Sequence, residues 1–172
     1  MQIRRATDAD QPTIVHIIKS VYDEYGFSWD AEGYNADLYA IEENYGENFW
    51  IAEVDGSPIG CVGLDLFPTI PGTTGELTEF EGALRIAGSD CELCRLYVLP
   101  EGRGKKIGRS LYETTIETAK ALGSSQMEIW SDKKLVEAHK LYQKTGARAV
   151  GDRICDDPDE SPEWGFCLTL DR

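Results

Sequence analysis

The stretch from Cys91 to Glu113, CELCRLYVLPEGRGKKIGRSLYE, restricts the fold more than any other part of the sequence. Its apolar run ends at Pro100, which cannot donate to a sheet ladder, so the run predicts a strand. A turn rich in Gly, Arg and Lys follows, and a helical pattern then begins near Lys106 or Ile107 and ends at Gly123. This order is typical of a phosphate-binding site, because the first turn of a helix presents unpaired N–H groups and partial positive charge.

The turn concentrates positive charge in an acidic chain. Four of the 17 Lys and Arg residues lie between Arg103 and Arg109, although the formal net charge is −14. Gly104 and Gly108 allow the main chain to approach a ligand closely. The turn matches neither a P-loop, which needs Gly-Lys followed by Ser or Thr, nor a dinucleotide fingerprint, which needs Gly in place of Ile107. Considered alone, it is also compatible with a solvated turn of exposed lysines.

The rest of the chain alternates strand-like and helix-like segments with no break in composition, so we expect one α/β or α+β domain over residues 1–172. Strands are predicted at 2–6, 126–131, 147–154 and 163–170, with a hairpin at 49–67 around Asp55-Gly56-Ser57. Helices are predicted from a Thr7 or Asp8 cap to Tyr25, at 36–45 and at 135–145. The helix after the basic turn should bury Ile107, Leu111, Thr115, Ala119 and Leu122. Residues 68–90 begin as a loop and end as strand or loop.

Composition and charge exclude several classes of function. The negative charge argues against nucleic acid or an anionic membrane as a partner and suits a cationic or amine substrate. No signal peptide and no membrane span are expected, because the N-terminus lacks an apolar core and no run approaches ~18 apolar residues. Five unevenly spaced cysteines indicate reduced thiols and a cytoplasmic protein. Cys91 and Cys94 form a C-x-x-C inside a strand, and with only His16 and His139 available no metal site is expected.

The segment LYVLPEGRGKKIGRSLYE resembles the acyl-CoA-binding signature of the GNAT superfamily of N-acetyltransferases, in which Arg or Gln, two residues, Gly, one residue, and Gly or Ala succeed one another. Arg103 and Gly108 match the ends of this pattern, whereas Lys106 occupies the position of the central Gly. LVEAHKLYQKTGA is similar to a later helix of the family, with an Ala, a Tyr four residues on, and a Gly. Leu135 stands where many members carry an Asn that contacts the cofactor. The order of elements matches over essentially the whole chain.

This resemblance implies an α/β fold with a central mixed, mostly antiparallel, splayed sheet flanked by about four helices. It also implies acetyl-CoA as co-substrate and no metal. Pantetheine would pair with the main chain of the signature strand, and the pyrophosphate would lie on the amides of the turn. The implied cofactor-binding residues are Leu96, Tyr97, Val98, Arg103, Gly104, Lys105, Lys106, Ile107, Gly108, Arg109 and Leu135.

The implied reaction is direct acetyl transfer from acetyl-CoA to a primary amine in a ternary complex. Tyr142 matches the family's general acid, which protonates the departing thiolate. Glu92 matches a carboxylate that several members use to remove the amine proton through water, although a rim glutamate that only orients the substrate is an equal alternative. In an unbulged strand Glu92 would share a side with Cys94 and Leu96.

The acceptor is less well defined by the sequence. Residues 22–46 combine acidic and aromatic side chains that would attract a cation, so we expect a small amine, an amino acid or a protein amine. These residues are Asp23, Glu24, Asp30, Glu32, Asp37, Glu42, Glu43, Tyr25, Trp29 and Tyr34. Asp132 and His139 are secondary candidates for the base, with His139 expected at the surface. A homodimer is compatible with the sequence, and the alternative functions are a non-catalytic acyl-CoA sensor or partner-binding module and a thiol switch at Cys91 and Cys94.

Overall fold

The computed structural model describes residues 1–171 of the chain. Within these residues the strands are β1 (Gln2–Arg5), β2 (Phe49–Val54), β3 (Ser57–Leu66), β4 (Leu77–Phe80), β5 (Ala83–Ile86), β6 (Cys91–Val98), β7 (Gln126–Asp132), β8 (Arg148–Ile154) and β9 (Pro162–Thr169). The α-helices are α1 (Gln11–Tyr25), α2 (Ile41–Tyr45), α3 (Ile107–Ala121) and α4 (Val136–Lys144). Short 3-10 helices lie at Asp8–Asp10, Ala36–Tyr39 and Pro100–Gly102. None of the helices in this part of the chain has the length and apolarity needed to cross a membrane.

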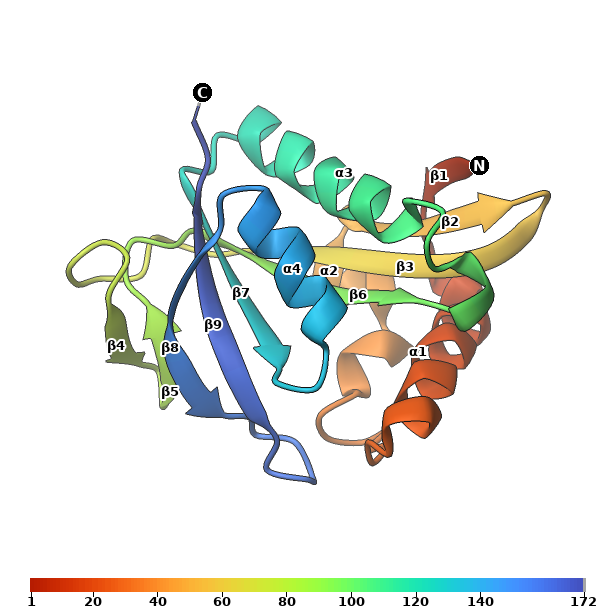
Figure 1. Cartoon of the computed structure of the whole chain (residues 1–172), viewed down its shortest axis with the longest axis horizontal. Coiled ribbons are helices and arrows are strands. Elements are labelled where there is room, and N and C mark those ends of the chain that lie inside the picture. The colour runs from red at the N-terminus through yellow and green to blue at the C-terminus, as the bar shows by residue number, and fades with distance from the viewer. Residues whose placement is uncertain (172) are drawn as a thin grey trace. The chain divides into compact units, whose positions relative to one another are not determined.

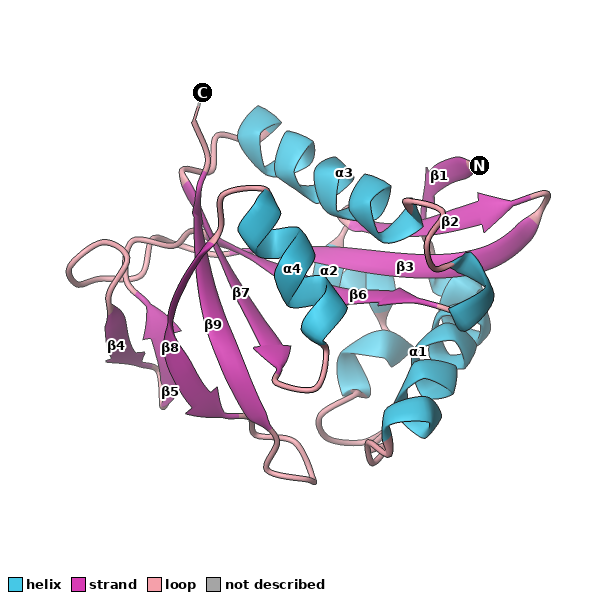
Figure 2. Cartoon of the chain, viewed as in Figure 1, coloured by secondary structure: helices cyan, strands magenta, loops and turns pink. Residues whose placement is uncertain are grey.

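The described chain divides into two compact units. Unit 1 comprises Met1–Asp65, Cys94–Thr115 and Asp156–Asp159, and unit 2 comprises Leu66–Leu93, Ile116–Cys155 and the chain from Glu160 onward. The strand order is β1-β2-β3-β6 in unit 1 and β6-β7-β9-β8 in unit 2, so each unit uses part of β6. The strands are drawn in magenta and the helices in cyan in Figure 2. The β6–β7 pair is parallel, whereas β1–β2, β2–β3, β7–β9 and β8–β9 are antiparallel. The predicted mixed, mostly antiparallel sheet with about four helices is confirmed.

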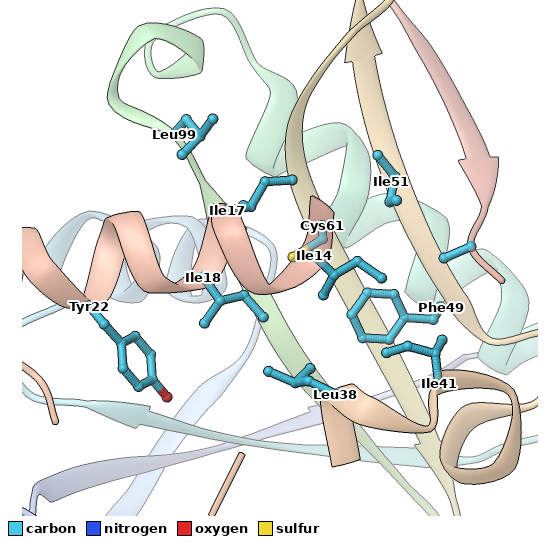
Figure 3. Packing of buried hydrophobic residues seen from close by; sticks show 11 residues of the cluster. Ile14, Ile17, Ile18, Tyr22, Leu38, Ile41, Phe49, Ile51, Cys61 and Leu99 are labelled. Atoms are coloured by element: carbon cyan, nitrogen blue, oxygen red, sulfur yellow. The ribbon is translucent and has the colours of Figure 1, made fainter. Parts of the chain in front are cut away.

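The sheet of unit 1 is covered on both faces. Ile14, Ile17 and Ile18 of α1 are completely buried in a core that also contains side chains of β2 and β3, such as Phe49 and Cys61 (Figure 3). Burial of each such side chain contributes about 1.5–3 kcal/mol. On the opposite face of β3, a Cβ on Gly60 would lie 3.1 Å from Leu111 of α3. The absence of a side chain at Gly60 therefore lets α3 pack closely on the strand.

The sheet of unit 2 also has two different faces. One, the α4 face, carries Phe166 of β9. The ring centroids of Phe166 and Tyr142 are 5.6 Å apart, so α4 packs on this face (Figure 1). The other, the hairpin face, is covered by β4 and β5, because Arg85 of β5 donates to Glu128 of β7 at 2.5 Å. Since successive strand residues point to opposite faces, Glu92, Glu128 and Trp130 all belong to the hairpin face.

Two local predictions differ from the structure, and a third allowed either strand or loop. The single helix expected at 36–45 is divided, because Ala40 takes an extended conformation (φ −148°, ψ 67°) between the 3-10 helix and α2. Leu122 does not close the apolar stripe of α3: it lies past the last helical turn and is 56% exposed. Residues 77–86 form a hairpin whose Glu81-Gly82 turn has positive φ at both positions, 51° and 80°.

β6 is interrupted at Arg95, so the assumption of an unbulged strand was wrong. Arg95 has φ 55°, a left-handed conformation that breaks the alternation of side chains. Glu92 and Leu96 therefore do not share a side by simple parity. The conformation is held by the side chain, since Arg95 Nη2 and Nε donate to Asp37 at 2.6 and 3.1 Å and Nη2 also donates to the Tyr34 carbonyl at 2.7 Å.

We predict that Asp37→Asn destabilises the protein by about 3 kcal/mol, because it leaves the nearly buried Arg95 guanidinium without its charged partner. Glu24→Gln is the matched control. Glu24 also forms a bidentate ion pair with an arginine, Arg103, but both side chains are 38% exposed. Its expected effect is below about 1 kcal/mol. Urea unfolding of both variants measures the difference, and equal destabilisation would contradict the importance assigned to Arg95.

Candidate functional site

The basic turn of unit 1 has an unusual backbone. After the 3-10 helix that ends at Gly102, Gly104 has φ 74° and Lys106 has φ 64°, and α3 starts at Ile107. A lysine at a left-handed position costs on the order of 1 kcal/mol, which glycine would not incur. Lys106 thus occupies the position of the motif glycine and adopts a backbone conformation that favours glycine. The turn leads directly into the N-terminus of a 15-residue helix.

The four basic side chains of the turn divide into two pairs. Arg103 is held by Glu24 of α1 at 2.6 and 2.7 Å and donates to the Val98 carbonyl at 3.2 Å. Arg109 pairs with Glu113 one helical turn later at 2.7 Å. The side chains of Lys105 and Lys106 form no hydrogen bond or ion pair with any of residues 1–171. The two lysines are therefore the charges immediately available to an anionic ligand.

Leu96, Tyr97 and Val98 form the end of β6 that leads into this turn. Tyr97 packs edge-on against Tyr22 with ring centroids 5.8 Å apart. The methyl groups of Val98 lie beside the two nearest glycines: a Cβ at Gly102 would come within 2.9 Å of one, whereas a Cβ at Gly108 would make an ordinary 3.5 Å contact with the other. The tight packing at Gly102 fixes the path of the turn, while Gly108 has space around it.

Glu92 belongs to a group of charged side chains on the hairpin face of unit 2. Glu128 is completely buried and accepts hydrogen bonds from Arg85 and from the Ile86 amide at 2.8 Å. Arg153 donates to Glu163 at 2.9 Å. Glu92 itself lies 3.7 Å from Arg85 and keeps 22% of its side-chain surface exposed. Among these groups Glu92 is the carboxylate that solvent or a substrate can reach.

The surroundings of Glu92 make it a strong base for a carboxylate. Burial raises the pKa of Glu92 to about 8, and the negative charges of Glu128 and Glu163 act in the same direction. Arg153 and Arg85 oppose this change without cancelling it, because each already binds another carboxylate. A carboxyl group with this pKa can accept and release a proton near neutral pH.

Tyr142 lies on the α4 face, on the other side of the unit 2 sheet from Glu92. It is 3% exposed and packs against Phe166. Leu135 stands at the N-terminal cap of α4 and is half-buried. The two predicted catalytic side chains therefore do not form a hydrogen-bonded pair, and each can act only from its own face.

The expectation of a surface role for His139 was wrong. His139 is 8% exposed, its Nε2 lies 3.1 Å from Ser131 Oγ, and its ring packs on Phe166. Residues three apart lie side by side on a helix, so His139 shares the buried face of Tyr142. Burial lowers the pKa of His139, which favours the neutral ring. Asp132 is engaged locally, because its carboxylate accepts from the Lys134 amide at 2.7 Å.

Several acidic residues expected to attract an acceptor are already engaged within unit 1. Asp37 binds Arg95, Glu24 binds Arg103, and Asp30 accepts from the amides of Gly33 and Tyr34 at 3.0 and 3.1 Å. Much of the negative charge in residues 22–46 thus stabilises the fold.

The thiols give little support to a redox site. Burial raises the pKa of Cys91 to about 12, which makes its thiolate scarce at neutral pH. Cys94 is half-buried, and none of the five cysteines forms a disulfide within the described residues. Across residues 1–171, no three His, Cys, Asp or Glu side chains are grouped so that they could hold a metal ion.

Two features of the site were missed by sequence reasoning. The first is Glu128, which forms a buried ion pair with Arg85. A charged residue in the apolar run QMEIWS is a sequence signal for such a pair. The indole of Trp130, also on the hairpin face, is stacked under the Arg153 guanidinium at 4.0 Å. Nothing in the local sequence indicates this contact, because Arg153 lies on another strand.

Comparison with known proteins agrees with this geometry. Residues 14–147 match the acetyltransferase (GNAT) family model. An uncharacterised N-acetyltransferase of Escherichia coli K12, YjgM, is 29% identical over 150 residues, which cover 84% of this chain and 80% of the relative. The N-acetylaspartate synthetase of Mus musculus is 29% identical over 123 residues, 68% of this chain and 34% of that protein.

Solved structures show the same fold. A GNAT-family acetyltransferase of Staphylococcus aureus Mu50 superposes with a TM-score of 0.73 at 20% identity, over 99% of both chains. The putative acetyltransferase yncA of Salmonella typhimurium, solved with acetyl-CoA, gives 0.69 at 20% identity, over 100% of this chain and 95% of that one. Because the family model spans well over half of the sequence, the chain belongs to the GNAT family and is an acetyltransferase.

Proposed function

We propose that this acetyltransferase moves an acetyl group from acetyl-CoA to a primary amine by direct attack in a ternary complex. The observation that carries the proposal is the basic turn before α3. It combines two left-handed residues, two lysines without partners in the described chain and the N-terminus of a long helix. Such a turn fits a diphosphate by charge and by exposed amide groups. We also propose a cytoplasmic location, because an odd number of cysteines without disulfides suits a reducing compartment.

The acceptor must lose a proton before it attacks. Transfer of a proton from an alkylammonium group of pKa about 10.4 to an ordinary glutamate of pKa about 4.3 costs about 8 kcal/mol, whereas transfer to a group of pKa about 8 costs about 3 kcal/mol. The raised pKa of Glu92 therefore removes most of this cost. In the proposed reaction Glu92 takes the amine proton, directly or through water.

Tyr142 completes the proton balance. Acetyl-CoA supplies the acetyl thioester, whose carbon–sulfur bond breaks as the new carbon–nitrogen bond forms. Tyr142 gives its hydroxyl proton to the departing sulfur as general acid, and the second proton lost by the attacking nitrogen restores the phenol once the amide has formed. Lys105 and Lys106 hold the phosphates, and the main chain of Leu96, Tyr97 and Val98 binds the pantetheine arm.

Calorimetric titration with acetyl-CoA, followed by thiol release over a library of amines, tests the whole proposal. Binding together with thiol release that depends on an amine is the expected result. Tight binding with no release across the library would contradict transfer to an amine.

Lys106→Ala and Lys106→Gly separate the charge of this residue from its backbone conformation. Both remove the positive charge, so we expect both to weaken acetyl-CoA binding by about 2- to 5-fold. Only glycine removes the left-handed strain, and the Gly variant should be more stable than the Ala variant by about 1 kcal/mol. Calorimetry and urea unfolding measure the two effects. Tighter binding by Lys106→Gly would mean that the lysine obstructs the turn.

Tyr142→Phe should lower turnover by ~10²-fold or more while acetyl-CoA affinity is retained, because the ring still packs on Phe166 but cannot give a proton. Tyr112→Phe, at another buried tyrosine, is the control and should keep turnover within about 2-fold. Steady-state kinetics with calorimetric binding distinguish the outcomes. If Tyr142→Phe turned over at the wild-type rate, Tyr142 would not be the acid.

Glu92→Gln should abolish a rise in activity that has its midpoint near pH 8. The amine ionises equally in both enzymes, so the ratio of wild-type to variant kcat/KM should increase through pH 8 and level off above about pH 9. At the plateau the variant should be slower by about 10²-fold. A constant ratio between pH 6 and 9 would contradict the assignment of Glu92 as base.

The raised pKa of Glu92 also makes the stability of the wild-type protein depend on pH. In the folded protein the pKa of Glu92 is raised, so the unfolded chain loses this proton from about pH 4.5 upward while the folded protein keeps it until about pH 8. Wild-type stability should fall relative to Glu92→Gln across that window, by a few kcal/mol at most, and not change further above it.

A further inference from the structure

The side chain of Trp130 contains a buried hydrogen-bond donor without an acceptor. Trp130 is 8% exposed, and its Nε1 is the buried side-chain polar atom within residues 1–171 that lacks a hydrogen-bond partner. Nearly all buried polar groups in proteins are paired, and an unpaired donor costs the full desolvation of that group. A donor kept at this cost on the same face as the candidate base indicates a ligand-binding role.

The orientation of the indole ring follows from its contacts. A Cβ placed on Gly165 of β9 would lie 2.7–3.1 Å from Cζ3, Cη2 and Cε3 of Trp130. These atoms form the edge of the ring opposite Nε1, so the N–H points away from Gly165 and β9. Arg153, tied to Glu163 at 2.9 Å and to the Leu84 carbonyl at 3.0 Å, holds the ring by stacking on it at 4.0 Å.

On the side of β7 away from β9 lies β6, which carries Glu92. Glu92 pairs with Glu128 in the parallel ladder, which ends one residue later at Leu93 and Ile129. Trp130 is the next residue of β7 on the hairpin face after Glu128, about 7 Å further along the strand. The indole N–H and the Glu92 carboxylate therefore belong to one face, on neighbouring strands.

The charged groups of this face differ in how closely they are paired. Glu128 is satisfied by Arg85 and the Ile86 amide, and Glu163 is paired with Arg153. Glu92 has the longest of these ion-pair separations, 3.7 Å, and a partly exposed side chain. A ligand here would meet a proton acceptor at Glu92 and a neutral donor at Trp130.

We propose that Trp130 binds the acceptor substrate by donating its indole N–H to a carbonyl oxygen on the carbon next to the reacting amine. The substrate class is thereby narrowed from primary amines to α-aminoacyl compounds, that is, free amino acids or the N-termini of peptides. An alkylamine can use Glu92 but leaves the indole N–H unpaired. This inference rests on the proposed function, because it takes the amine beside Glu92 as the acetyl acceptor.

Glycinamide and isobutylamine test the inference, because they have the same shape and only glycinamide carries the carbonyl. Wild-type kcat/KM, expressed per unprotonated amine, should favour glycinamide. Trp130→Phe keeps an aromatic ring under Arg153 but removes the N–H, and it should lower kcat/KM for glycinamide by about 5- to 10-fold, the effect of one hydrogen bond. The value for isobutylamine should stay within about 2-fold. Trp164→Phe, on the opposite face of β9, is the matched control and should change neither.

A measurement without a substitution gives a second test if Trp130→Phe does not fold. Among the four indole N–H signals of ¹⁵N-labelled wild-type protein, one should move on addition of glycinamide and remain in place with isobutylamine. Glycine and glycylglycine, compared in the same assays, distinguish the free amino acid from the peptide N-terminus.

The possible failures are distinguishable. Absence of thiol release with every amine would overturn the proposed function. Acetylation of both amines with equal efficiency, with Trp130→Phe reducing both alike or neither and no selective indole shift, would overturn the role of Trp130 and leave the acetyltransferase proposal standing.

Discussion

The conformation of β6 at Arg95 is the constraint on which the candidate site depends. β6 supplies the base candidate to unit 2 and the main chain that leads to the basic turn in unit 1, and the left-handed residue lies between these two parts. An L-residue adopts this conformation only when its surroundings compensate for the cost. Here the compensation comes from Asp37 and the Tyr34 carbonyl, which bind the guanidinium from a segment far away in the sequence. The irregular connection between α1 and β2 is thus part of what sets the shape of the strand.

The unit 2 sheet separates two kinds of chemistry. Its hairpin face gathers carboxylates and guanidinium groups around Glu92, while its α4 face carries neutral groups around Tyr142, namely the Phe166 ring and the His139–Ser131 pair. Burial and the neighbouring carboxylates on the hairpin face raise the pKa of Glu92. The proposed acid, Tyr142, lies on the other face of the sheet.

The regular elements were predictable because their signals are local. The Asp55-Gly56 turn identified the β2–β3 hairpin, and both residues have positive φ, 51° and 78°. Glu81 and Gly82 also both have positive φ. Glu-Gly is not one of the usual hairpin-turn dipeptides, so the β4–β5 hairpin was not recognised. The Arg95 conformation had no local signal, since it depends on a partner 58 residues away.

The same distinction applies to the site. The proposed cofactor segment is continuous in sequence, so it could be predicted from its resemblance to the family signature, and Tyr142 was predicted from a second motif of the family rather than from helical spacing. The residues proposed for the acceptor side, among them Glu92, Trp130 and Arg153, come from different strands and become neighbours only through strand pairing. Pairing of distant strands cannot be inferred from the periodicity of one segment.

The pairing of Arg103 with Glu24 has an energetic consequence for the basic turn. A carboxylate of the protein itself already satisfies this arginine, so a phosphate can use the guanidinium only by exchanging with Glu24. Glu24 therefore competes with the phosphate for Arg103. The affinity of the turn for a phosphate is lower than its charge suggests, by the free energy of the Arg103–Glu24 pair. Ligand exchange would also release the last turn of α1 from the basic turn, so that occupancy of the turn and attachment of this helix end are thermodynamically linked.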